Sequence, residues 1–118
     1  MIESLVKLSG STSGKSIKIA ATATAGTTLH TAVSGTTTFD MIHLWISNTD
    51  TSDRTVTIEF GGVTDPDNLI NKAFTIPAKT MKKVLEGQLL NGGLTLAAFA
   101  SSANVLLATG YVLRVANS

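Results

Sequence analysis

The chain has 118 residues, of which 43% are hydrophobic and 14% are charged, and its net charge is +1. This length suits a single domain, and the absence of cysteine excludes disulfides and thiolate metal sites. The nearly neutral charge argues against binding nucleic acid or an anionic membrane by bulk electrostatics, and no apolar stretch is long enough to span a membrane.

The surface expected from this composition is poor in charge and rich in hydroxyl groups. An average globular domain has roughly 25% charged residues, whereas this chain has 14% and contains eighteen threonines. Such a surface suits strands and partners that cover it, so it favours an assembled protein over a free monomer. The start of the chain does not resemble a secretion signal, which together with the lack of cysteine indicates synthesis in a reducing cytoplasm.

The first candidate motif is Gly14-Lys15-Ser16, which resembles the end of a nucleotide-binding phosphate loop. In that loop, G-x-x-x-x-G-K-[ST], four residues separate the glycines, and a helix follows. Here Gly10 lies one residue too close to Gly14, and residues 15–25 alternate with a period of two, which predicts a strand. We therefore interpret this segment as a turn between strands at 4–8 and 15–25, and we predict no nucleotide site.

The remaining segments predict an all-β fold. Residues 26–37 are expected to form a polar crossing loop with Leu29 and Val33 directed inward. Further strands are expected, separated by turns, at residues 38–48, 54–60, 69–76, 79–86, 94–100 and 104–115. These about eight strands favour one antiparallel β-sandwich domain over residues 1–118, with either a jelly-roll or an immunoglobulin-like strand order. Residues 1–14 could form an N-terminal arm.

A second candidate motif is a calcium loop over residues 48–59. Oxygen-bearing residues occupy positions 1, 3, 5 and 12 of such a loop, namely Asn48, Asp50, Ser52 and Glu59. Position 6, however, is Asp53 rather than the required glycine, and the flanking segments are predicted strands. A hairpin with an Asx-type turn explains the same residues, so we predict no metal site.

The ionisable residues do not form a recognisable catalytic set. His30 and His43 are the only histidines, and neither has a second ligand at metal-binding spacing or a nearby nucleophile motif. We expect His43 to be a packed or an interface residue. Asp65 and Asp67 flank Pro66, where turn formation explains them. The sequence therefore predicts that the protein is not an enzyme and uses no cofactor or small-molecule substrate.

A lysine cluster and the single tryptophan can each be explained either by the fold or by contact with a partner. Lys79, Lys82 and Lys83 lie on both faces of the 79–86 strand, which is typical of a sheet edge protected against aggregation. Contact with an acidic partner is the alternative for these lysines. Trp45 is expected in the core, with a subunit contact as the alternative.

The central and C-terminal segments resemble a family of small virion proteins of tailed bacteriophages. The resemblance covers residues 29–115 and lies in LHTAVSGTT (29–37), WISNTDTS (45–52), TIEFGGVTDPDNLI (57–70), IPA (76–78), AFASSANV (98–105) and GYVLRV (110–115). The most specific elements are the Glu-Phe-Gly-Gly-x-Thr-x-Pro-Asp stretch, the Ala-Phe-Ala-x-x-x-Asn-Val turn and the Gly-Tyr-Val ending.

This resemblance implies a capsid decoration, or cement, protein. Such a protein is a small β-sandwich that binds the major capsid protein as a homotrimer on the outer surface of the virion head. A tail or fibre module is the alternative within the same class. A carbohydrate-binding β-sandwich is the alternative from another class, and we expect it less because the few aromatic residues fall at positions predicted to be buried.

Overall fold

The computed structural model describes residues 2–116 and contains nine strands and no helix within that range. The prediction of an all-β fold is thereby confirmed, although the strand count is one higher than expected. The strands are β1 (Ile2–Lys7), β2 (Ile17–Lys18), β3 (Thr27–Thr31), β4 (Thr38–Asn48), β5 (Arg54–Phe60), β6 (Leu69–Ile76), β7 (Met81–Leu90), β8 (Thr95–Ala100) and β9 (Leu106–Ala116).

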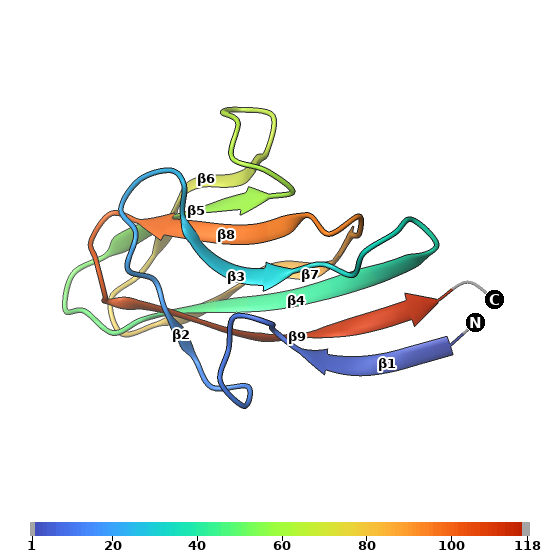
Figure 1. Ribbon diagram of the computed structural model, residues 1–118. Coiled ribbons are helices and arrows are strands. Elements are labelled where there is room, and N and C mark those ends of the chain that lie inside the picture. The colour runs from blue at the N-terminus through green and yellow to red at the C-terminus, as the bar shows by residue number, and fades with distance from the viewer. Residues whose placement is uncertain (1, 117–118) are drawn as a thin grey trace.

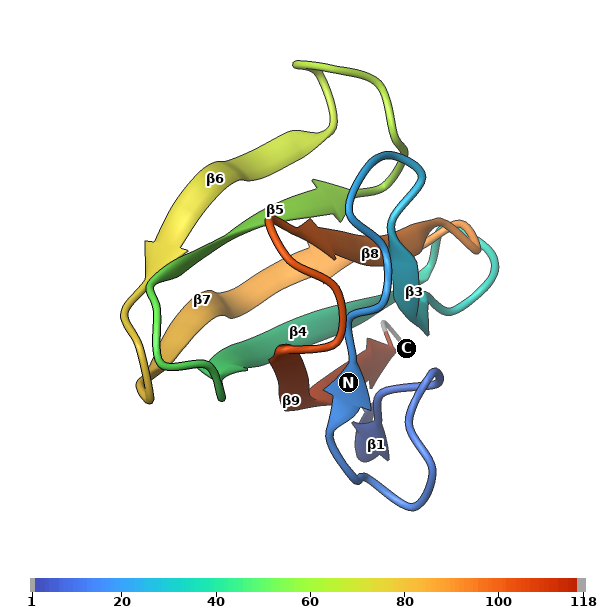
Figure 2. The ribbon, with the colours of Figure 1, turned by 90° about the vertical axis from the view of Figure 1, so that its left-hand side faces the viewer.

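The strands form two antiparallel sheets that pack face to face (Figures 1 and 2). The first sheet has the order β1-β9-β4-β7, with the short β2 also paired to β9, and the second has the order β3-β8-β5-β6. Apart from the β1–β2 and β5–β6 connections, each connection crosses from one sheet to the other. This is the strand order of a jelly roll rather than of an immunoglobulin-like sandwich.

Strand β4 shows how the core between the sheets is built. Its residues alternate strictly, so that Ile42, Leu44 and Ile46 are fully buried while the residues between them face outward. Burial of each such side chain is worth about 1.5–3 kcal/mol. The other large apolar side chains of the core are Leu8, Ile19, Leu29, Val56, Ile58, Ile76, Leu85, Leu96, Leu106 and Val112.

The prediction of one strand over residues 15–25 is wrong. Only Ile17–Lys18 pairs with β9, and the chain then leaves the sheet. The backbone N–H groups of Ala20 and Ala21 both donate to Thr27 Oγ1, at 3.2 and 3.1 Å, which closes residues 22–26 into a loop. Ile19 is nevertheless fully buried. The alternation in the sequence therefore marked neither a continuous strand nor a buried face, because Ala23 and Ala25 are exposed.

The prediction of a crossing loop over residues 26–37 is wrong in its first part. Thr27–Thr31 forms β3 and pairs with β8, with a register shift between Thr28 and His30. This irregularity lets the adjacent residues Leu29 and His30 both be buried, which breaks the two-residue period that would reveal a strand. Leu29 points inward as predicted, and Val33 is half-buried.

The bounds of β7 also differ from the prediction. The strand was expected at residues 79–86 and lies at Met81–Leu90. Lys79 has a φ of 58° and belongs to the preceding turn. Gly87, just beyond the predicted end of the strand, has a φ of 86° and lies within β7, where the β4–β7 register shifts. A glycine bulge of this kind continues a strand rather than ending it.

Residues 1–14, which could have formed an arm, are partly built into the first sheet. All six residues of Ile2–Lys7 pair with β9, and Met1 lies outside the described residues. Strand β1 occupies one edge of the first sheet and β7 the other (Figure 1). The placement of β7 agrees with the prediction that its lysines protect an edge: Lys82 and Lys83 are both exposed.

Candidate assembly surface

The outer face of the first sheet carries a row of apolar side chains that crosses β1, β9, β4 and β7. Leu5 of β1 lies opposite Leu113 of β9, which lies opposite Met41 of β4, which in turn lies opposite Leu89 of β7. Leu5 is 75% exposed and Leu89 is 52% exposed, whereas the two central members are half-buried. We call these four residues the apolar row. No other part of residues 2–116 covers its two ends.

An aromatic cluster adjoins the apolar row on the same face. The rings of His43 and Tyr111 stack with centroids 4.8 Å apart, and Trp45 lies 6.0 Å from Tyr111. Lys83 Nζ lies 4.8 Å from the centre of the Trp45 ring, within cation–π range. The expectation that Trp45 belongs to the core is wrong, because the alternation of β4 places it among the outward-facing residues.

His43 is distinctive within this cluster. Its Nδ1 is the one buried side-chain nitrogen or oxygen without a hydrogen-bond partner among residues 2–116. Such atoms are rare in native proteins, and each calls for an explanation. This one lies on the outer face of the sheet, beside Tyr111, rather than in the core.

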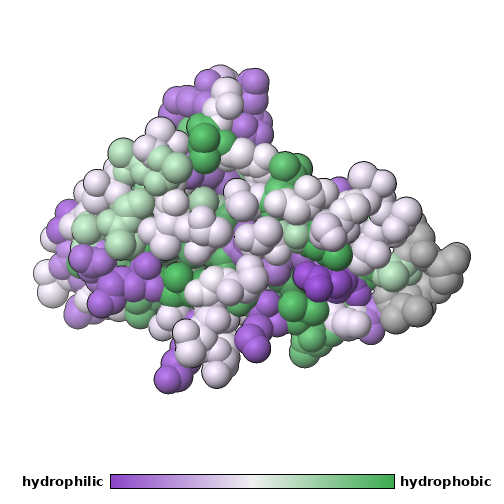
Figure 3. Space-filling model, in the orientation of Figure 1, coloured by the Kyte–Doolittle hydropathy of each residue, from purple (hydrophilic) through white to green (hydrophobic). Residues whose placement is uncertain are grey.

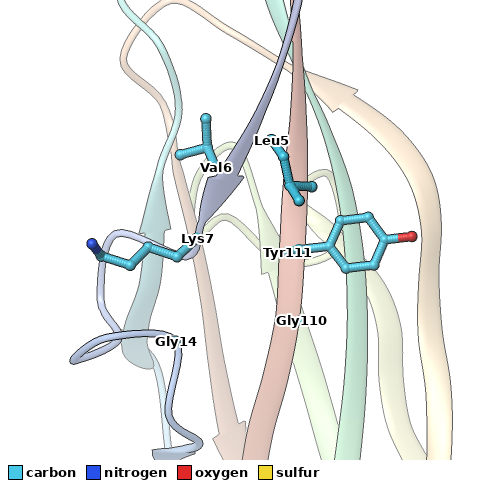
Figure 4. A pocket seen from close by; sticks show the side chains of 6 residues that line it. All are labelled: Leu5, Val6, Lys7, Gly14, Gly110 and Tyr111. Atoms are coloured by element: carbon cyan, nitrogen blue, oxygen red, sulfur yellow. The ribbon is translucent and has the colours of Figure 1, made fainter.

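The face is hollowed next to the apolar row. A shallow depression of about 450 Å³ is lined by Leu5, Val6, Lys7, Gly14, Gly110 and Tyr111 (Figure 4). In this view Tyr111 and Leu5 lie on one side of the β1–β9 pair, and Lys7 extends toward the loop that contains Gly14. The space-filling view shows separate hydrophobic patches among neutral and hydrophilic areas, one of them along the lower edge near β1 (Figure 3).

The interior holds a polar cluster of His30, Asp40 and Arg114, which joins β3, β4 and β9. His30 Nε2 lies 2.7 Å from Asp40 Oδ2, and Arg114 Nε donates to Asp40 Oδ1 at 2.7 Å. The backbone N–H of Val33 donates to the same carboxylate at 3.1 Å. His30 and Asp40 are fully buried. Burial alone would raise the pKa of Asp40, but the hydrogen bonds from Arg114, His30 and Val33 outweigh it and hold the pKa below its usual value.

The contacts of this cluster differ from those of a catalytic triad. Ser9 lies beside His30, which in turn contacts Asp40, so the three residue types are those of a Ser-His-Asp triad. The backbone N–H of Ser9 donates to His30 Nδ1 at 3.0 Å, and Ser9 Oγ accepts from the backbone N–H of Thr31 at 2.7 Å. Both ring nitrogens of His30 are therefore occupied, and neither can take the hydroxyl proton.

A second buried carboxylate, Glu59, fastens the loop of residues 22–26. The Thr24 hydroxyl donates to Glu59 Oε2 at 2.5 Å, and the backbone N–H of Gly26 donates to Oε1 at 2.7 Å. A Cβ at Gly26 would overlap the backbone of Ala98, so only glycine allows this approach. Glu59 alternates with the core residues Ile58 and Phe60 along β5, so it lies on the outer side of the strand, but this loop buries it completely.

The structure separates the residues of the calcium-loop motif. Asn48 Nδ2 donates to the carbonyls of Ser52 and Ile76, and Asp50 pairs with Arg54 at 2.6 Å. Glu59 is used elsewhere, as described above. The Asx-type turn is confirmed, because the backbone N–H of Asp50 donates to Asn48 Oδ1 at 2.9 Å. The prediction of a hairpin is wrong, because β4 and β5 belong to different sheets and do not pair.

The other candidate residues lie in turns at the surface. Gly14-Lys15-Ser16 occupies the exposed segment between β1 and β2, and Lys15 is exposed. No helix follows it, since β2 begins at Ile17. Asp65 pairs with Lys72 at 3.0 Å on the surface, and Asp67 is exposed in the same turn.

Residues 2–116 contain no group of three or more histidine, aspartate or glutamate side chains placed to hold a metal ion. A helix long and apolar enough to cross a membrane is also absent from that range. Searches of protein-family models, of curated proteins and of solved structures give no match to this chain.

Sequence reasoning missed the polar cluster and the buried position of Glu59. A signal for the first was present: Asp40 is in phase with the buried Ile42 and Leu44 of its strand, and Arg114 is in phase with Val112. A charged residue at a core position of a strand implies a paired charge, because an unpaired buried charge is too costly. No comparable signal marked Glu59, since a distant loop buries it.

Proposed function

We propose that this protein is a non-enzymatic structural protein of a tailed-phage virion, and that it decorates the outer surface of the head. In this proposal it folds in the host cytoplasm, assembles as a homotrimer and binds the major capsid protein. The apolar row is the observation that carries the proposal. It ends in two strongly exposed leucines, Leu5 and Leu89, whose burial needs a partner.

Three further observations support it. The segments of residues 29–115 resemble those of small phage virion proteins, and jelly rolls recur in viral capsid domains. His43 Nδ1, beside the apolar row, lacks a partner within residues 2–116. The interior ionisable groups His30, Asp40 and Glu59 are each bonded within the chain, which fits a role in the fold.

The mechanism is mechanical. A packaged genome pushes outward on a thin shell, and a rigid sandwich that bridges neighbouring capsid subunits adds contacts that must break before the shell ruptures. A trimer strengthens this effect, because three modest footprints on one particle act at a high effective concentration. No moving part or bound ligand is needed.

Immunogold labelling of virions from the phage or prophage that encodes the chain tests the proposal. Label on the head surface is the expected result, and the purified protein should bind heads that lack it and raise the temperature at which they release DNA. Label on the tail or fibres would replace the decoration role by the alternative module. Virions without label would overturn the virion assignment itself.

One observation favours a second candidate, a carbohydrate-binding module. Tyr111 is exposed beside the depression, and Trp45 also lies on the outer face, where aromatic rings can stack on sugars. Lys83, however, covers the ring of Trp45. Binding to a glycan array that is lost in Tyr111→Ala would support this candidate, and absence of glycan binding would remove it.

A further inference from the structure

Strand β1 leaves one edge of the first sheet open, and this edge is self-complementary. β1 has β9 as its only strand neighbour among the described residues. We propose that two copies of the chain pair antiparallel through β1, across a two-fold axis at Leu5. The result is one continuous sheet with four strands from each copy along the path β7-β4-β9-β1, and the short β2 of each copy remains paired with β9. The contact adds to the proposed function and does not depend on it.

The other three edges are unsuited to such pairing. β7 presents the exposed Lys82 and Lys83 at successive positions, which repels a second strand. β6 contains Ala73 with a φ of 52°, and its register with β5 shifts twice. β3 is short and has its own register shift. By contrast, all six residues of β1 pair regularly with β9, so its free edge has the regular geometry that strand addition requires.

The face of each residue limits the registers that β1 can adopt with a second β1. The register with β9 assigns Glu3, Leu5 and Lys7 to the outer face, on which Leu113 lies, and Ser4 and Val6 to the inner face, on which the buried Val112 lies. Directly opposite residues in an antiparallel pair point to the same face. If the two outer faces are to continue as one surface, outer residues must therefore oppose outer residues.

Charge then selects one register among those that remain. When Leu5 opposes Leu5 of the second copy, Glu3 opposes Lys7 and Lys7 opposes Glu3, so two attractive pairs form. A shift of two residues between the copies instead places Glu3 or Lys7 opposite Leu5. Opposite charges directly across two strands stabilise the pair, and like charges destabilise it.

The selected register also continues the apolar row. Leu5, the most exposed large apolar side chain of the described residues, meets Leu5 of the second copy at the axis. The four residues of the row then join their four counterparts into one band across both molecules. The pairing thus buries apolar surface, satisfies backbone groups of an open edge and forms two charge pairs, all through the six residues of β1 in each copy.

A two-fold contact is distinct from the contact that would hold a trimer. Shells of repeated subunits contain both kinds of axis, so β1 could join two neighbouring trimers on a head. In solution, the contact makes the assembly contain an even number of copies: two, or six where a trimer forms as well.

Charge reversal with the full chain tests the pairing, with mass measured by light scattering or sedimentation over a concentration series. Glu3→Lys and Lys7→Glu each replace both attractive pairs by like charges, and each should weaken the contact about tenfold or more. The double variant E3K/K7E restores opposite charges and should recover the wild-type mass. Lys15→Glu makes the same change of charge in an exposed loop and should leave the mass unchanged.

Engineered cysteines provide a second readout that does not depend on affinity, because the native chain has no cysteine. Directly opposite residues have Cα atoms about 4.5–5.5 Å apart, which suits a disulfide. Leu5→Cys should therefore form a covalent dimer under mild oxidation. Glu3→Cys alone should not, whereas a mixture of Glu3→Cys and Lys7→Cys chains should form the mixed dimer.

The outcomes separate this inference from the proposed function. A monomer at every concentration, charge variants that leave the mass unchanged, or a double variant that does not recover would each overturn the β1 contact. A trimer whose mass none of the variants alters would also overturn it, while leaving head decoration in place. Label absent from the virion, together with a two-fold dimer that behaves as described, would overturn the proposed function alone.

Discussion

Two regions of the molecule reverse the usual rule that polar side chains are exposed and apolar ones are buried: the polar cluster lies inside the sandwich, and the apolar row lies on its outer face. Within the core, Asp40 is fully buried and receives hydrogen bonds from Arg114, His30 and Val33. On the outer face, Leu5 is 75% exposed and touches no second sheet. The hydrogen-bonded polar groups of the interior stabilise the folded chain. The exposed apolar side chains of the outer face have no packing partner in the chain, which suggests that another molecule covers them.

The largest effect expected from this contrast concerns the centre of the polar cluster. Asp40→Asn removes the charge that pairs with Arg114 and leaves hydrogen-bond donors without an adequate acceptor. Loss of one partner of a buried ion pair costs about 3–5 kcal/mol, so the free energy of unfolding should fall by that amount in urea titrations. Asp67→Asn, in an exposed turn, is the control and should change it by less than about 0.5 kcal/mol.

Acid should weaken the same cluster. The pKa of Asp40 is lowered in the folded chain, while the unfolded chain has the usual value of about 3.9. The contribution of this carboxylate is thus complete above about pH 4 and declines as the pH falls toward the folded pKa, because the unfolded state takes up its proton first. Unfolding free energies measured between pH 7 and pH 2.5 should show this slope. An unchanged slope in Asp40→Asn would contradict the assignment.

A smaller effect is expected at the second buried carboxylate. Glu59→Gln replaces one of two acceptor oxygens by a donor, so either Thr24 or Gly26 loses its bond. A buried donor left unpaired costs about 1–3 kcal/mol. Thermal unfolding should show this loss, and limited proteolysis should become faster within residues 22–26. Glu86→Gln, exposed on β7, provides the matched substitution that should alter neither.

The smallest effect on stability is expected on the apolar row, where the effect on assembly should be largest. Leu89→Ser should change the free energy of unfolding by less than about 0.5 kcal/mol but reduce binding to undecorated heads. Its neighbour Leu90 is 8% exposed and faces the core, so Leu90→Ser should cost at least about 2 kcal/mol. Equal destabilisation by the two variants would show that the row serves the fold and not a partner.

Much of the fold was determined by the sequence alone. The apolar run of residues 38–48 and the period-two alternation of residues 54–60, with turn residues between them, were enough to predict two strands at their observed bounds, Thr38–Asn48 and Arg54–Phe60. Alternation is a local consequence of strand geometry, in which successive side chains point to opposite faces, so it can be read without knowledge of the partner strand. The same reasoning identified Gly14-Lys15-Ser16 as a turn.

Tertiary structure decided which strands pair and which face of each is covered. The 22–26 loop buries Glu59, the register shift in β3 buries His30 beside Leu29, and the alternation of β4 sends Trp45 outward. These outcomes depend on contacts between residues far apart in the chain, such as Asp40 and Arg114, 74 positions apart. A sequence pattern shows that a strand has two faces, but only the packing of the two sheets selects the one that stays open.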